Sequence, residues 1–203
     1  FNGKDNKKKS GFIAEFFCHL YMKYLGYEQH FIFQNLEEQG AMKKGFDGLY
    51  QLNEEMWLYE SKSSLHTTQN ANHNSNIGEA FHDIDKKLQG KKLDNNDKPI
   101  SPWNNAINHA SLLQVKQDKS LIENLNSFKK RFNKQDFENI KNFNVIPSST
   151  IFLEDKWATI DNNDLKIKLE RLIKDYKYKK MNILCINKKS IESFMRYVDE
   201  KIQ

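Results

Sequence analysis

The chain has few of the residues that build disulfide frameworks, membrane spans or nucleotide-binding loops. Only two of its 203 residues are cysteines, Cys18 and Cys185, and both lie in apolar segments. Two cysteines exclude a disulfide framework and a multi-cysteine zinc cluster, and they favour a reducing, cytoplasmic compartment. No apolar run reaches the roughly 18 residues of a membrane span, and no signal-peptide pattern stands at the start. The glycine-rich phosphate loop of a nucleotide-driven motor is also missing, so any such motor would be a partner protein.

The residues that are present are sufficient for a buried core. Hydrophobic residues make up 38% of the chain and aromatic residues 12%. The length is that of one domain, so we expect a polar, flexible segment over residues 1–10 and a single domain over 11–203. The chain begins at Phe1 rather than at Met, which is compatible with a piece of a longer protein.

Positive charge is in mild excess, with a net charge of +5 and an isoelectric point near 9.0. A single basic run is more often a solvated helix face than a binding site. Several runs in one small domain favour an anionic partner such as DNA. The runs lie at 7–9, 86–92, 129–134 and 174–180.

Apolar periodicity alternates between helical and strand-like along the chain, which predicts an α/β fold with helices flanking a mixed sheet. Pro147, near the start of one predicted strand, favours an edge or entry position for it. The expected helices span 11–26, 77–90, 103–117, 120–133, 162–178 and 189–202, and the expected strands span 28–34, 45–52, 56–63, 144–153 and 181–187.

Three charged residues lie in the two strands of the predicted hairpin, "GFDGLYQLNEEMWLYESKSS" from Gly45 to Ser64. Side chains alternate across a strand, so Glu60 and Lys62 share one face and Ser61 points away. A turn over residues 53–55 would pair residues near 47 with residues near 62, which places Asp47 next to the Glu60 and Lys62 end of the second strand. We therefore expect two carboxylates and one ammonium at one end of the sheet.

Such a trio suits a hard divalent cation. Mg²⁺ takes a few carboxylate oxygens, keeps several waters and accepts phosphate oxygens from a substrate. A bound cation makes water easier to deprotonate and offsets charge that develops on phosphorus. A neighbouring lysine could orient the attacking water or stabilise the phosphoryl oxygens.

The stretch "GFDG…YESK" resembles the PD-(D/E)xK nuclease superfamily, whose αβββαβ core has the order of elements expected here. The resemblance implies that Asp47 and Glu60 are ligands of Mg²⁺ or Mn²⁺ and that Lys62 is the catalytic lysine. It further implies Glu15, in the first helix within "GFIAE", as an accessory ligand. Phe46 replaces the proline of the family pattern.

A closer resemblance links "GFDGLY", "ESK" and "IGEAFHDIDKKL" to the nuclease subunit of the Hachiman antiphage system. It implies a role in antiphage defence with a helicase partner. The resemblance covers residues 10–93 and says almost nothing about 90–147, where we expect a helical insertion at about 94–143.

Further residues are weaker candidates. Ser63, Ser64, Lys43, Lys44 and His66 are expected to contact DNA, although strand termination and solvated loop positions also explain them. His73 belongs to the same polar loop as His66. Glu79 and His82 have the spacing of a metal pair on a helix, but a surface pair is the commoner meaning, and Tyr176 in "DYKYKK" suits either base stacking or the core. Glu15 could equally be a carboxylate satisfied by His19 one turn on.

The sequence therefore predicts a Mg²⁺-dependent DNA endonuclease that hydrolyses phosphodiester bonds. Alternatives are a type II restriction-like endonuclease, a DNA-binding module on the same fold that no longer cuts, and a scaffold protein with coincidental surface charges. Intact candidate ligands favour the enzyme.

Overall fold

The computed structural model describes residues 6–30, 45–69, 71–111, 118–154, 156 and 158–202. Helices and strands alternate along the chain as the sequence predicts, and the fold is α/β. The elements are α1 (Asn6–Tyr24), β1 (Glu28–Gln29), β2 (Gly48–Leu52), β3 (Glu55–Leu65), α2 (His73–Leu88), α3 (Pro102–Ala110), α4 (Lys119–Asn133), a short 3-10 helix (Ile140–Asn142), β4 (Asn144–Phe152), α5 (Asn162–Ile173), β5 (Lys180–Met181), β6 (Leu184–Lys188) and α6 (Ile191–Ile202).

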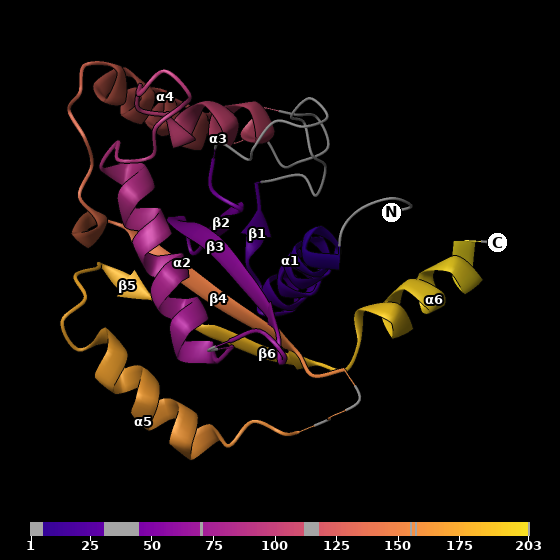
Figure 1. Ribbon diagram of the computed structural model, residues 1–203. Helices are drawn as coiled ribbons and strands as arrows, with labels where there is room; N and C mark the ends of the chain where they lie inside the picture. Colours follow the sequence, from indigo (N-terminus) through magenta and orange to yellow (C-terminus); the bar gives the residue numbers. More distant parts are fainter. Residues whose placement is uncertain are drawn as a thin grey trace.

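A mixed sheet forms the centre of the molecule (Figure 1). Its strands follow the order β1-β2-β3-β4-β5, and β6 also pairs with β4. The β1/β2 and β2/β3 pairs are antiparallel, whereas β4 runs parallel to β3, β5 and β6. The predicted mixed sheet flanked by helices is therefore confirmed.

The two faces of the sheet bury different helices. Leu58 of β3 belongs to the larger core cluster, with residues of α2, α3 and α4 such as Ile84 and Trp103. Its neighbour Tyr59 points the other way, into a cluster that contains Cys18 of α1. This alternation places α2 and α1 on opposite faces of β3.

The β2–β3 hairpin has a tighter turn than the sequence predicts. Asn53 and Glu54 form a two-residue turn with φ of 50° and 63°, the left-handed values of a type I′ turn. Leu52 therefore pairs with Glu55 and Gly48 with Tyr59. The prediction that residue 47 lies opposite residue 62 was wrong by two positions, because Glu55 already belongs to the strand.

Pro147 lies in the middle of the sheet, so its predicted edge or entry position was wrong. It pairs with Glu60 of β3, and β4 has neighbours on both sides. On the other side β5 pairs with residues 144–145 and β6 with 148–152. The Val145 carbonyl accepts from Asn182 on that side, and Pro147 faces the same way two residues later. Its missing N–H therefore falls in the gap between β5 and β6.

Other boundaries also differ from the sequence prediction. Residues 181–187 form parts of two strands, and β6 is half-buried. Helix α1 begins at Asn6, inside the segment expected to be flexible, and it exposes Leu20, Tyr21 and Tyr24. The region 94–143 contains α3, α4 and the 3-10 helix.

The predicted extensions at 31–34 and 112–117 lie outside the described residues. Within the described ranges, none of the helices has the length and apolar character needed to cross a membrane.

Candidate active site

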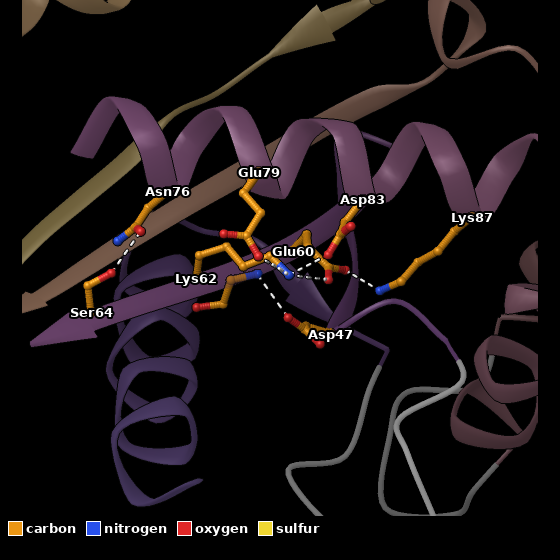
Figure 2. A network of polar contacts seen from close by, with 9 residues as sticks. Asp47, Glu60, Lys62, Ser64, Asn76, Glu79, Asp83 and Lys87 are labelled. Atoms are coloured by element: carbon orange, nitrogen blue, oxygen red, sulfur yellow. Dashed lines mark hydrogen bonds and ion pairs between the residues drawn. The ribbon is translucent and has the colours of Figure 1, made fainter. Parts of the chain in front are cut away.

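Asp47 and Glu60 lie side by side at one end of the β2–β3 hairpin (Figure 2). Glu60 is buried in β3, with 3% of its surface exposed, and Asp47 comes directly before β2. The register that pairs Gly48 with Tyr59 brings Asp47 opposite Glu60. The backbone N–H of Ser61 donates to Asp47 Oδ2 at 2.9 Å and fixes that carboxylate on β3. The structure therefore brings together the two carboxylates that the sequence singled out.

Two ammonium groups contact the Glu60 carboxylate. Lys87 Nζ lies 2.6 Å from Glu60 Oε2, and Lys62 Nζ lies 3.6 Å from Glu60 Oε1. Burial raises the pKa of Glu60 to about 7, and the Asp47 charge adds to the rise, which Lys87 and Lys62 only partly offset. Two close carboxylates in a desolvated site thus compete for positive charge.

Lys62 is held by carboxylates of its own strand and of α2. Its ammonium donates to Asp83 of α2 and lies 3.7 Å from Glu79 Oε1. Burial alone would lower the pKa of Lys62, but Glu60 and Asp83 raise it above its ordinary value. Burial would raise the pKa of the Asp83 carboxyl. The hydrogen bond from Lys62 and the Lys62 charge outweigh this effect, so the pKa lies below its ordinary value. The Lys62 ammonium is therefore held between carboxylates of β3 and α2.

Helix α2 supplies a row of polar side chains that face β3 (Figure 2). Ser64 Oγ donates to Asn76 Oδ1 at 2.9 Å, and the Lys62 and Glu60 contacts follow along the same pair of elements. We call this row the polar seam, defined by Glu60, Lys62 and Ser64 of β3 and by Asn76, Glu79, Asp83 and Lys87 of α2. It runs beside the apolar packing of Ile77, Phe81, Ile84 and Leu88.

Asp83 and Lys87 are site residues that the sequence interpretation missed. With Asn76 and Glu79 they recur at intervals of three and four residues, which places them on one helix face. That spacing was the available signal. These side chains face β3, because the opposing face of β3 is polar too.

Glu15 belongs to the helix that packs on the opposite face of the sheet from α2. It lies on α1, and its charge adds to the effect of burial in raising the pKa of Cys18 and Tyr50. Its role as an accessory ligand stays a prediction. In the described ranges no three His, Cys, Asp or Glu side chains are grouped to hold a metal ion by themselves. A cation at Asp47 and Glu60 would therefore take further ligands from water or phosphate, as Mg²⁺ commonly does.

The predicted DNA-contacting residues do not share one surface. Ser63 Oγ lies 3.4 Å from Ser10 Oγ of α1, whereas Ser64 faces α2. His66 follows β3, and its Nδ1 lies 4.0 Å from Glu154 Oε2. Lys43 and Lys44 lie outside the described residues.

His73 does not belong to a polar loop, because it is the first residue of α2 and is buried. Its Nδ1 and Ser149 Oγ are 2.8 Å apart, and its Nε2 lies 3.2 Å from Asn187 Oδ1. Burial lowers the pKa of His73 despite the Asn187 hydrogen bond. We assign it a structural role at the start of α2.

Two other weak candidates are also explained by packing. Tyr176 stacks on Phe81 with ring centroids 4.2 Å apart, so it faces the core. Glu79 faces Lys62, whereas the exposed His82 packs its ring edge-on against Tyr176. Glu79 and His82 therefore do not converge on a common point.

No protein-family model, curated protein or solved structure matches this chain in the three comparisons. The functional assignment accordingly depends on the residues and geometry of the site.

Proposed function

We propose that this chain is a Mg²⁺- or Mn²⁺-dependent endonuclease that hydrolyses phosphodiester bonds in DNA. The observation that carries the proposal is the buried Glu60 carboxylate beside Asp47, with Lys62 on the same strand face. The mixed sheet and the order of its elements agree with the αβββαβ core that the motif resemblance implies.

The donor set fits a hard divalent cation. Asp47 and Glu60 offer carboxylate oxygens. The Asp47 charge helps to raise the pKa of Glu60, and a cation shared by the two carboxylates would reverse this rise. An ammonium already lies 2.6 Å from Glu60 Oε2, so positive charge is favourable at this oxygen. When bound by Asp47 and Glu60, the metal would make water easier to deprotonate and offset charge on the phosphate.

Lys62 would position and neutralise the phosphate. Asp83 holds its ammonium beside Glu60, and its raised pKa keeps it protonated at neutral pH. A fixed positive charge next to a developing oxyanion stabilises the transition state without reorganisation.

DNA is the proposed substrate because the chain is basic and carries several basic runs. One of these runs, 86–92, includes Lys87, whose ammonium contacts Glu60. Contacts from lysines of these runs to DNA phosphates would position a duplex without reading its sequence. From the closer motif resemblance we further propose that a helicase partner works with this chain in antiphage defence.

A DNA-binding module that does not cut is the second candidate. The observation that favours it is that lysines of the polar seam already contact both oxygens of Glu60. Such a module would bind plasmid in EDTA and leave it uncut in Mn²⁺.

Cleavage of supercoiled plasmid tests the proposal. The purified chain should nick plasmid in Mg²⁺ or Mn²⁺ and not in EDTA, and Asp47→Asn, Glu60→Gln and Lys62→Met should each lose at least about 100-fold in rate. Glu55→Gln is the matched control, because Glu55 begins the same strand but pairs with Lys180, away from the site. Metal-independent cutting, or full activity in the three site variants, would contradict the proposal.

A further inference from the structure

We propose that Lys87 is an exchangeable counter-ion of the candidate metal site: its ammonium neutralises Glu60 in the metal-free protein and leaves when a divalent cation binds. This inference rests on the proposed function, because it concerns how the same carboxylates take up a metal. It assigns a role to a residue outside the Asp47, Glu60 and Lys62 motif.

The position of Lys87 supports the exchange. Its ammonium lies 2.6 Å from Glu60 Oε2, and both side chains are almost fully buried. A metal ligated by this oxygen would lie next to that ammonium. Like charges held this close repel strongly in a desolvated site, so both cations cannot contact Oε2 together.

The two lysines of the polar seam differ in the ion pairs that they would keep if Glu60 bound a metal. Lys62 forms ion pairs with three carboxylates in the described ranges, whereas Lys87 forms one with Glu60. If Glu60 turned to a metal, Lys62 would keep Asp83 and Glu79. Lys87 would lose its Glu60 contact, so it is the cation that exchanges.

The end of α2 provides an alternative position for the Lys87 ammonium. Lys87 lies in the last turn of the helix, one residue before its final residue, Leu88. Carbonyl groups at a helix C-terminus attract positive charge, and a long lysine side chain can carry its ammonium to solvent. In the proposed exchange the Lys87 side chain changes rotamer.

The inference predicts two effects of opposite sign when the Lys87 charge is removed. Without metal, Glu60 loses its closest counter-ion, and the protein becomes less stable. With metal, the competitor is gone, and the site binds the cation more tightly. A purely structural role for Lys87 predicts the first effect without the second.

Calorimetric titration with Mn²⁺ at pH 7.5 tests this in the whole chain. Lys87→Met keeps the length of the side chain and removes its charge, and we expect its Kd for Mn²⁺ to be about 10- to 100-fold lower than that of the wild type. Lys86→Met is the matched control, because Lys86 is the exposed neighbour on the same helix. It loses the same charge and should change the Kd by less than about threefold.

The outcomes separate the two proposals. If the wild type binds Mn²⁺ and Lys87→Met binds it no more tightly than Lys86→Met does, the exchange is wrong and the metal site stands. If the wild type and both variants bind no Mn²⁺, the metal-dependent function is wrong as well. If Lys87→Met alone binds, the exchange is supported in its strongest form.

Folding of the variant gives a second measurement. Should Lys87→Met be unfolded in EDTA, Mn²⁺ should restore its circular dichroism spectrum, because the metal replaces the lost positive charge at Glu60. Failure of saturating Mn²⁺ to refold it would contradict the exchange.

Discussion

Glu60→Gln should remove a specific pH dependence from the stability of the metal-free protein. The pKa of Glu60 rises from an ordinary value of 4.5 to about 7, chiefly because the carboxyl is buried and then because Asp47 is close. Each tenfold change in proton affinity is worth about 1.4 kcal/mol, so the whole shift corresponds to about 3 kcal/mol. Glutamine keeps the shape of the side chain and does not titrate.

The direction follows from the raised pKa. Between about pH 4.5 and 7 the folded protein binds a proton at Glu60 more strongly than the unfolded chain does. The contribution of Glu60 to the free energy of unfolding is therefore fully present below about pH 4.5. It is lost as the pH rises through about 7 and stays constant above that.

Urea unfolding in EDTA from pH 4.5 to 8 measures this contribution. The free energy of unfolding of the wild type, minus that of Glu60→Gln, should fall by about 3 kcal/mol across the range. Glu55→Gln is the control, because the Lys180 hydrogen bond lowers the pKa of Glu55, which predicts a dependence of opposite sign. A wild-type minus Glu60→Gln difference that does not vary with pH would refute the reasoning about the buried carboxyl.

Two further substitutions test the seam and its surroundings by urea unfolding. Asp83→Asn weakens the hydrogen-bonded ion pair of the largely buried Lys62 and should lower the free energy of unfolding by about 1–3 kcal/mol. Glu79→Gln changes an exposed carboxylate and should lower it by less than about 0.5 kcal/mol. Equal losses would contradict the view that Asp83 holds Lys62 more strongly than Glu79 does. Gly48→Ala should cost about 1–3 kcal/mol, because a Cβ there would lie 2.9 Å from Tyr59 Cδ1, and an unchanged stability would show that this packing can relax.

The order of elements and the grouping of Asp47 with Glu60 could be predicted because they follow from local pattern. Alternation alone placed Glu60 and Lys62 on one face of β3. The hairpin register was harder, because it depends on whether the turn has two or three residues. Asn53 and Glu54 both take left-handed φ values, and Glu54 is not a residue type that signals them. Asp47 therefore lies opposite Glu60 and not opposite Lys62.

Asp83 and Lys87 could not be recognised without the partner strand. Helical periodicity identifies an apolar stripe and assigns the remaining polar positions to solvent. In α2 some of those polar positions face β3 instead, because Glu60 and Lys62 supply charges that match them. A local pattern carries no information about such a match across the fold.

The position of Pro147 depended on long-range pairing in the same way. The rule that prolines avoid central strands concerns the missing N–H. Here that N–H falls where one neighbour, β5, has ended and the next, β6, has not begun. A gap of this kind is a property of the assembled sheet, and it cannot be predicted from the residues around Pro147.

The central claim is that Asp47 and Glu60 together make the chain a metal-dependent nuclease. Its most direct test is the rate of strand breakage in supercoiled plasmid with wild type and with Asp47→Asn, each in Mn²⁺ and in EDTA. We expect breakage only with the wild type in Mn²⁺. Equal rates for the two proteins in Mn²⁺, or breakage by the wild type in EDTA, would contradict the account.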